Sequence, residues 1–562
     1  MGDSPRLRLR LPFRFLPSAP IARVGNENPK LKHKQRIVTM LLHVLLDVES
    51  EFEYLTSTCT FFVFLILLLV AIAGATVLSF NHILKYSSNT SFKPSKTLGH
   101  NDDIPCFEHD QHSLDTVKFI LEPSSSPSPS SSYQPSIDIN TLLHERAIPN
   151  ARLVRALGLT NTFVSASPEV HHTFVRRALG MLHRAKERGW DWVADVARQA
   201  VGSGGLENPS SAAYLAPQGS GEERIIKFDA LIQNTTLLVV LVVLLGQDES
   251  RFESSASDSN PHCTSNLSPC FTQSDIECVA KNITLLWGLS KLPKAIPPHI
   301  LEELNGALGR LTGGRQRDDE GNGEEDKDED GDLEGFDNPL DFVVPAWETL
   351  WRVVATTVAY AYACRDDDSA HVKEALMEFM KGPTEAQFRR ASDADADASS
   401  EMLNLELVDV RCIVAECMRL HPPSKHIGRS KARAWWAFVL SILPAGWTQH
   451  PWGISHFTRV KVNADIGALL RCQKIWGADA ASFVPRRHLP LKVTKEQKEA
   501  MGGVFGYRRL RCVGATWAPM AAGIVAGAVV EKMEREGMEV VKGRGGIGGR
   551  EGWEGWWVIR KR

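Results

Sequence analysis

Apolar residues recur at steps of three and four over long stretches of this chain, the spacing that places them on one face of an α-helix. Such stretches lie at 174–196, 300–311, 343–362, 402–420 and 518–533. Pro422 and Pro423 end the fourth stretch, because proline lacks an N–H and restricts the residue before it. Strand-like stretches such as 458–462 are few. The pattern predicts a mainly α class with minor β.

Two apolar runs differ in what their lengths allow. Residues 61–80 hold no charge, and twenty residues of helix at about 1.5 Å each cross a hydrocarbon core of roughly 30 Å. We therefore predict a single-pass transmembrane anchor at 59–80. The run 237–245 has only nine residues and is too short to span, so a buried core helix is predicted there.

Charges near the predicted anchor give two opposing indications of its orientation. Residues 41–58 hold four acids and no Lys or Arg, whereas 81–100 hold Lys85, Lys93 and Lys96. This favours a cytoplasmic C-terminal body. The nine Arg and Lys residues of 1–40 favour the opposite orientation.

Two segments are too polar to form a core. Twelve of the fourteen residues in 123–136 are Ser or Pro, which indicates a linker. Residues 318–337 hold twelve acids and one Lys, so they contribute −11 to a net charge of −3 and indicate a solvated acidic insertion at 316–337. The chain is accordingly divided into an N-terminal extension 1–58, the anchor 59–80, a Ser/Pro-rich linker 81–140, one large domain 141–545 and a tail 546–562.

Composition excludes some classes of function. The chain lacks clustered Arg and Lys with interleaved aromatic residues, so no nucleic acid is expected as a partner. Ten cysteines without a C-x-x-C pair argue against zinc clusters. Cys263, Cys270 and Cys278, together with the sequon-like Asn266 and Asn282, leave two interpretations: a disulfide-bonded secreted region, or free cysteines that act as small hydrophobic residues.

Cys512 stands near three arginines close to the C-terminus. It follows Arg508, Arg509 and Arg511 and comes just before the apolar stretch 518–533. A helix N-terminus and nearby cations favour the thiolate over the thiol. Such a thiolate suits a soft metal or haem iron, and the arginines suit carboxylates of a bound group. The other interpretation is a small apolar residue in a glycine-rich turn.

A second motif lies at the end of the stretch 402–420. Glu416 and Arg419 stand at i and i+3, the spacing of a helical ion pair, and are followed by His-Pro-Pro at 421–423 and by Arg487. Together these residues resemble the E-x-x-R and P-E-R-F signatures of the cytochrome P-450 family. The resemblance implies that Glu416, Arg419 and Arg487 form a buried ion cluster. All three must pair, because a buried unpaired charge costs several kcal/mol.

Further motifs follow in the order of that family. Glu348 and Thr349 resemble the acid and alcohol of its oxygen-activating helix, and 475–481 (IWGADAA) resembles a segment before the later arginine. The resemblance implies one haem domain of the cytochrome P-450 fold, with Cys512 as axial ligand of the iron of haem b. It implies Glu348 and Thr349 as the catalytic proton relay. The residues expected at the cofactor are Phe505, Arg509, Arg511, Cys512 and Gly514.

The implied activity is that of a monooxygenase that inserts one oxygen atom of O₂ into an apolar organic substrate. Its electrons come from NADPH through a cytochrome P-450 reductase. The implied protein is of the fungal membrane-anchored type, in the endoplasmic reticulum with its haem domain in the cytoplasm.

The loop around Cys512 departs from the family pattern. Arg508 stands where the pattern has glycine, and Leu510 stands where it has arginine. We expect backbone strain at Arg508. His172 and Arg176 are the nearest match to the family's W-x-x-x-R. Two alternatives therefore stay open: a P-450-fold isomerase or dehydratase of oxidised substrates, and a catalytically dead, anchored interaction protein that uses 316–337.

Overall fold

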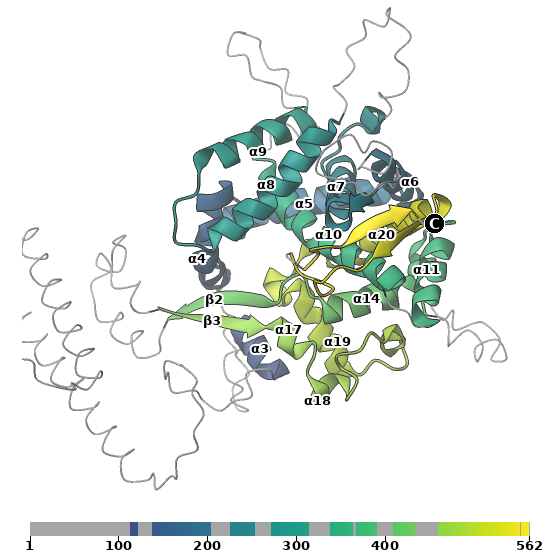
Figure 1. The fold of residues 1–562 in the computed structure, drawn as a ribbon. Coiled ribbons are helices and arrows are strands. Elements are labelled where there is room, and N and C mark those ends of the chain that lie inside the picture. Colours follow the sequence, from purple (N-terminus) through teal and green to yellow (C-terminus); the bar gives the residue numbers. More distant parts are fainter. Residues whose placement is uncertain are drawn as a thin grey trace, which may run out of the picture. The chain divides into compact units, whose positions relative to one another are not determined.

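Helix α10 (Leu340–Ala363) lies near the centre of the structure, and other helices pack around it (Figure 1). Helices α7 (Phe228–Val239), α11 (Asp367–Phe379), α14 (Val410–Leu420) and α20 (Ala518–Arg535) all contact it. Its sequence explains this position, because Val, Ala, Leu and Trp cover nearly all of its sides rather than one face.

The structure is a computed structural model that describes residues 113–121, 138–203, 225–252, 271–313, 338–363, 367–389, 408–432, 459–550 and 552–560. All of these residues belong to one compact unit, Pro105–Arg562. The remaining described helices are α3 (Leu114–Leu121), α4 (Ile139–Leu157), α5 (Pro168–Glu187), α6 (Trp190–Val201), α8 (Gln273–Ser290), α9 (Pro298–Leu311), α12 (Glu385–Arg389), α17 (Ile466–Leu469), α18 (Gln473–Trp476) and α19 (Lys495–Gly502).

Three of the five helical predictions are confirmed over their whole length, and 402–420 is helical from Val410, with 402–407 outside the described residues. Helices α9, α10 and α20 cover the predicted stretches 300–311, 343–362 and 518–533, and α14 ends at Leu420, just before the two prolines. The prediction of one helix over 174–196 is wrong. The chain ends α5 at Glu187 and begins α6 at Trp190, because Gly189 between them has φ +86°, which breaks a right-handed helix.

The second apolar run is a core element, as predicted. Residues 237–245 are all buried; they form the end of α7 and a π-helical turn, Val240–Leu244. In α14, the Asp409 side chain accepts a hydrogen bond from the Cys412 N–H (2.6 Å), which satisfies one of the open donors at the start of this helix.

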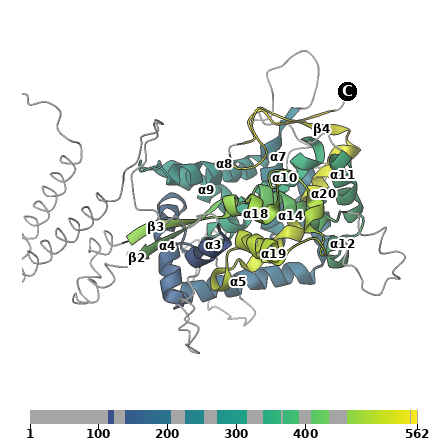
Figure 2. The ribbon, with the colours of Figure 1, turned by 90° about the horizontal axis from the view of Figure 1, so that it is seen from below.

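Two small antiparallel sheets supply the minor β content. In the first, β5 (Trp557–Arg560) lies between β1 (Ile225–Lys227) and β4 (Met538–Val541), with Val558 opposite both Ile226 and Val540. In the second, β2 (His426–Ala432) pairs with β3 (Arg459–Asp465), which includes most of the predicted strand 458–462. Figure 2 shows the β2–β3 pair at one end of the structure and α5 along one edge.

The sheet β1-β5-β4 corrects the predicted C-terminal boundary. Residues 546–562 were expected to form a tail, yet β5 is the central strand of this sheet. Trp553 and Trp556 are also buried beside Phe228, with ring centroids 5.1 and 5.7 Å from its ring. The boundary at 545 falls between two paired strands, so the described part of 546–562 belongs to the domain.

Several predicted segments lie outside the described residues. They are the extension 1–58, the anchor 59–80, most of the linker 81–140 and the acidic insertion 316–337. Within the described ranges, no helix combines the length and the hydropathy that a membrane span needs. The predicted anchor remains a prediction.

Candidate functional site

The fold brings Glu416, Arg419 and Arg487 together in a buried ion cluster. Two nitrogens of Arg419 donate to the two carboxylate oxygens of Glu416, at 2.7 and 2.8 Å. Arg487 Nε donates to Glu416 Oε1 at 3.1 Å. His488 Nε2 lies 2.8 Å from Glu416 Oε2 and completes the group, which we call the ion cluster. The sequence motif indicated the first three members but not His488.

Main-chain groups satisfy the remaining donors and acceptors of the ion cluster. Arg419, which is fully buried, donates to the carbonyl oxygens of Leu470, Ala480 and Ser482 at 2.8, 2.6 and 3.1 Å. Arg487 also pairs with Asp479 (Nη2–Oδ2, 3.1 Å). A buried ion pair stabilises a fold only when its other hydrogen bonds are made, and here they are.

The ion cluster keeps Glu416 ionised. Burial alone would raise the pKa of this carboxyl, but the hydrogen bonds and charges of Arg419 and His488 lower it to about 2. Two residues beyond Arg419, His421 Nε2 lies 2.9 Å from the Tyr360 hydroxyl of α10. Burial, with the nearby Arg471 and Lys425, lowers the pKa of His421 to about 4.

Residues 505–514, which we call the Cys loop, place Cys512 at the surface of the domain. The Cys512 N–H donates to the Phe505 carbonyl oxygen at 2.7 Å, so the loop closes on itself. Gly506 makes the turn with φ +79°, and a Cβ there would lie 3.0 Å from the Leu510 carbonyl oxygen. The side chain of Cys512 is exposed, as are those of Arg509 and Arg511.

The strain expected at Arg508 is present. Its φ is +42°, and among the described residues no other non-glycine residue has a positive φ. This is the left-handed region, where a Cβ is unfavourable by about 1–2 kcal/mol. Arg508 therefore adopts the conformation for which the family pattern uses glycine.

The surroundings of Cys512 affect its acidity in opposite directions. Desolvation by the surrounding protein raises the pKa of the thiol, and the Gly514 backbone N–H and the Arg511 charge oppose this shift without cancelling it. The predicted preference for the thiolate remains a prediction. Helix α20 begins only at Ala518, and a 3-10 turn, Val513–Ala515, lies between.

The Cys loop is connected to α5 and α10 by a small apolar cluster. Val513, the residue after Cys512, packs against the group formed by Ala178 and Met181 of α5 and Phe342 of α10. Phe342 also stacks on Phe174, with ring centroids 5.0 Å apart. The helix that contains Glu348 and Thr349 is thereby tied to the residue beside Cys512.

Glu348 and Thr349 lie in α10 but have different surroundings. Glu348 is 2% exposed, and its Oε1 accepts a hydrogen bond from Arg550 Nε at 2.9 Å. The Thr349 hydroxyl is half-buried and donates to the Pro345 carbonyl oxygen at 3.0 Å. Pro345 has no N–H for the Asp341 carbonyl, which accepts from Asn161 Nδ2 instead (2.8 Å).

Two buried arginines form a site that the sequence did not reveal. Arg146 on α4 and Arg429 on β2 are 7% and 5% exposed, and the Nε of each has no hydrogen-bond partner. Burial and the Arg429 charge lower the pKa of Arg146 to about 9. Among the described residues, neither guanidinium forms an ion pair with a carboxylate, and Glu145 is the acid that acts on Arg429 at longer range. Such a pair favours an anion.

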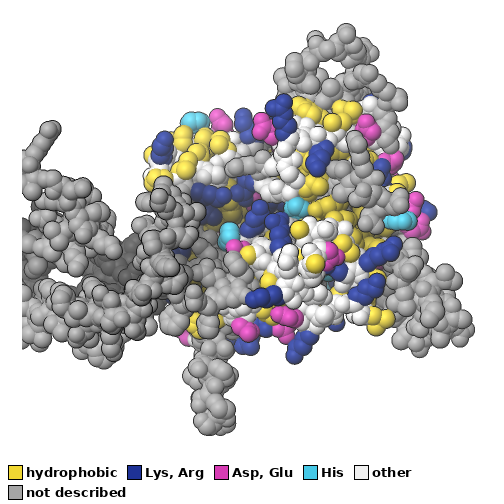
Figure 3. Space-filling model, turned by 60° about the horizontal axis from the view of Figure 1, so that its bottom comes forward, with side chains coloured by type: hydrophobic (Ala, Val, Ile, Leu, Met, Phe, Trp, Pro, Cys, Tyr) yellow, Lys and Arg dark blue, Asp and Glu magenta, His cyan; other side chains and the backbone are white. Residues whose placement is uncertain are grey.

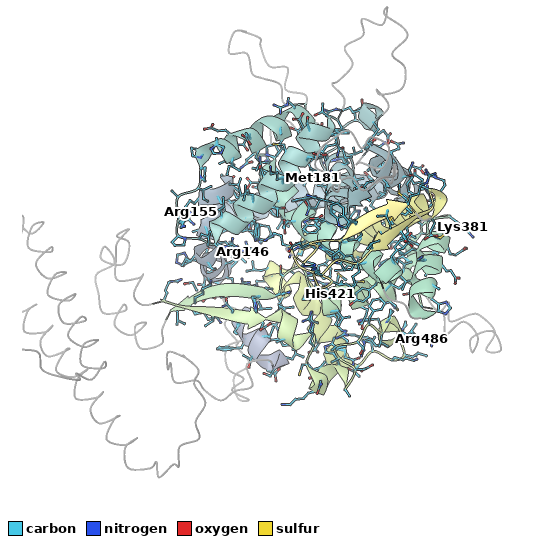
Figure 4. All side chains as sticks on the ribbon, viewed as in Figure 1. Arg146, Arg155, Met181, Lys381, His421 and Arg486 are labelled. Carbon is cyan, nitrogen blue, oxygen red and sulfur yellow. The ribbon has the colours of Figure 1, made fainter. Side chains whose placement is uncertain are left out.

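Helix α5 connects the arginine pair with the Cys loop. His171 Nδ1 lies 2.8 Å from the Thr162 hydroxyl, and Arg146 Nη2 donates to the Thr162 carbonyl oxygen at 2.5 Å. Ala178, which packs in the cluster with Val513, is seven residues further along α5, a rise of about 10 Å. Figure 4 labels Arg146 at the α4 side and Met181 and His421 nearer the centre.

The disulfide-bonded interpretation of 263–282 fails where the structure describes it. Cys278 is a free, half-buried thiol. Asn282 is 5% exposed inside α8 and donates to the Cys278 sulfur at 3.3 Å, so it is not an accessible glycosylation site. Cys263, Cys270 and Asn266 lie outside the described residues.

Neither a family model nor a curated protein matches the chain. Solved structures similar to it include a cytochrome P450 (CYP102L1), with 15% identity over 74% of this chain and 85% of that one and a TM-score of 0.42. The heme domain of cytochrome P450DA has 14% identity over 76% and 86%, with a TM-score of 0.41. At these TM-scores the likeness adds nothing to the geometry described above.

Proposed function

We propose that this protein is a haem-thiolate monooxygenase of the cytochrome P-450 type. The observation that supports this most is the combination of an exposed Cys512 sulfur in a closed loop with the fully paired ion cluster at the positions of the family's motif. The motifs alone are short, and the ion cluster alone is structural. Their occurrence in one domain, in the family's order, favours the proposal.

The residues present fit a haem group. The Cys512 sulfur is a soft ligand for iron, and metal binding removes the thiol proton despite a raised pKa. The two carboxylates of haem b match the two buried guanidinium groups of Arg146 and Arg429, whose free Nε–H groups need acceptors. We therefore propose that Arg146 and Arg429 bind the haem carboxylates. Arg509 and Arg511 would border the haem on the side of the Cys loop.

When bound, the haem supplies the one-electron and O₂ chemistry that the amino acids lack. The protein's own groups orient it and move protons. Glu348 holds a buried carboxylate oxygen, Oε2, without a hydrogen-bond partner, which is free to take up and release a proton. Thr349 is the next residue of the same helix, and its hydroxyl is fixed by the hydrogen bond that it donates to the Pro345 carbonyl oxygen. Both residues then serve as the proton relay.

Electron supply and location follow from the same proposal. The exposed face of α5 has His172, Arg176, Arg177 and Arg184, and α5 contacts the 3-10 turn Val513–Ala515 that follows Cys512. Lys and Arg also gather near the middle of the face in Figure 3. A basic surface beside the ligand suits an acidic NADPH-dependent reductase. The predicted anchor 59–80 would hold the domain at the endoplasmic reticulum, as in fungal membrane-anchored members, near apolar substrates.

The test is the reduced-plus-CO difference spectrum of the purified full chain expressed with excess haem precursor. We expect the thiolate-type Soret band, its loss in Cys512→Ser, and its retention in Cys278→Ser, which alters another free cysteine. A wild type without the band would contradict the proposal. A band that survives Cys512→Ser would remove Cys512 as ligand.

One observation favours a second candidate, the haem-free interaction protein. Arg508 is held at φ +42° in the loop that must approach the iron, and the thiol pKa is raised. An iron assay that finds no stoichiometric metal in the same preparation would support this candidate. An isomerase of oxidised substrates would keep the CO band but would turn over a hydroperoxide without reductase.

A further inference from the structure

Both hydrogen bonds to the Glu348 carboxylate come from Arg550 and reach the same oxygen, whereas Arg352 Nε donates to the Glu348 main-chain carbonyl oxygen (2.9 Å). Arg550 Nε donates to Oε1 at 2.9 Å, Arg550 Nη2 also donates to Oε1, and Arg352 Nε lies 3.4 Å from it. Oε2 is buried and has no hydrogen-bond partner. One oxygen of the acid is therefore fixed by cations, and the other is left without a partner.

Arg550 comes from a glycine-rich loop, residues 542–552, which connects β4 with the turn before β5. A Cβ at Gly545 would lie 2.1 Å from the Gly552 carbonyl oxygen, and one at Gly543 would lie 2.2 Å from that of Glu554. The two limbs of this C-terminal loop are therefore too close for any side chain. A Cβ at Gly548 would lie 2.3 Å from His421 Nδ1, so the loop also lies against the end of α14.

Two tryptophans fix the loop to the core. Trp556 Nε1 donates to the Gly545 carbonyl oxygen at 3.2 Å, and Trp553 Nε1 donates to that of Gly549 at 3.1 Å. Both rings are buried against Phe228. The loop that holds Arg550 is thus anchored at both ends, which is what precise placement of a side chain requires.

The Arg550 guanidinium is also held from its other side. It lies over the Trp287 ring of α8, 4.7 Å from the centroid, and Arg152 of α4 lies 5.0 Å from the same centroid. The Arg550 side chain is 10% exposed. Contacts from α8 and α10 therefore leave Arg550 little freedom to leave Glu348.

We propose that Arg550 is a positioning residue of the monooxygenase, which fixes Glu348 through Oε1 so that protons pass only through Oε2. This inference rests on the proposed function. The reaction consumes two protons for each O₂ that is split into product oxygen and water, so in each cycle Oε2 twice takes up a proton and passes it on, and Glu348 returns each time to the carboxylate that Arg550 holds. Without Arg550 the carboxyl can rotate and exchange its two oxygens, and proton delivery is mistimed.

The experiment measures product formed per NADPH consumed, together with H₂O₂ released, in the full chain with its reductase. R550Q removes the charge and the two-point hold. R544Q alters an exposed arginine of the same loop and is the matched control. We expect R550Q to keep the CO band and to lose product per NADPH about tenfold, since small misplacements of a reacting group are costly. R544Q should match the wild type.

Repeating R550Q in the E348Q background distinguishes a role that acts through Glu348 from a merely structural role. If Arg550 acts through Glu348, R550Q lowers the product yield of E348Q no further, whereas an equal drop in both backgrounds would overturn the proposal. Should R550Q not fold, R550K replaces it: lysine keeps the charge but loses the planar two-point hold, and a severalfold drop is expected. A yield like that of R544Q would overturn the role of Arg550.

Different results would overturn the proposed function and the role of Arg550. A wild type without the CO band would overturn the proposed function, and the role of Arg550 with it. A normal band in wild type and R550Q, with equal product per NADPH, would overturn only the role of Arg550.

Discussion

The ion cluster and the Cys loop differ in how fully their polar groups find partners within the protein. In the ion cluster, Glu416 accepts from two arginines, a histidine and the Val484 N–H, and nothing further is needed. In the Cys loop, the exposed Cys512 follows a residue at positive φ, and three main-chain hydrogen bonds join residues within the loop. The polar groups of the first region are satisfied within the chain, whereas the second region combines an exposed cysteine with a strained backbone.

Removing the centre of the ion cluster should have the largest effect. Glu416→Ala leaves Arg419 buried without its partner, which costs about 3–5 kcal/mol of unfolding free energy. Urea unfolding of the purified domain measures it. Glu496→Ala, at an exposed acid of α19, should change the value by less than about 0.5 kcal/mol. Equal losses in both variants would show that the ion cluster contributes no special stability.

Low pH should lower the unfolding free energy through His421, which lies two residues beyond Arg419 of the ion cluster. Its pKa is about 4 in the folded protein and about 6.5 when unfolded, so the unfolded chain binds the extra proton. The contribution to stability is full above pH 6.5 and is lost as the pH falls towards 4, by about 3 kcal/mol. His421→Gln removes this titration. The difference in unfolding free energy between wild type and variant should therefore shrink between pH 6.5 and 4, and a constant difference would contradict the assignment.

A substitution in the Cys loop should raise the unfolding free energy instead of lowering it, and by a smaller amount. Arg508→Gly relieves a positive φ and is expected to raise the unfolding free energy by about 1 kcal/mol. Arg511→Gly is the control, since Arg511 is extended, with φ −65° and ψ +141°, and there glycine only adds freedom to the unfolded chain. Thermal unfolding of both variants measures the difference. A loss of stability in Arg508→Gly would show that the loop is not strained.

Sequence reasoning succeeded where the partners were close in the chain or joined by a motif. Glu416 and Arg419 are one helical turn apart, and the strain at Arg508 follows from a local pattern. It missed Arg550, because about 200 residues separate it from Glu348 and a glycine-rich end resembles a tail. It also missed the Arg146–Arg429 pair, whose members come from a helix and a distant strand.

The helix break at Gly189 shows a further limit. The apolar period continues through 174–196, and periodicity cannot detect a change of axis between two helices that bury similar faces. The stretch contains two glycines, Gly180 inside α5 and Gly189 at the break, and only the positive φ of Gly189 distinguishes the break from the tolerated glycine.

The sheet β1-β5-β4 has a consequence for how the protein is made. Strand β1 has its partner β5 about 330 residues later in the chain, and a ribosome that adds roughly 5–20 residues per second needs about 15–70 s to reach it. For that time β1 has no strand to pair with, and Phe228 lacks the two tryptophans that cover it. The emerging chain thus exposes an open strand edge and an aromatic surface, which are binding sites for chaperones and starting points for aggregation.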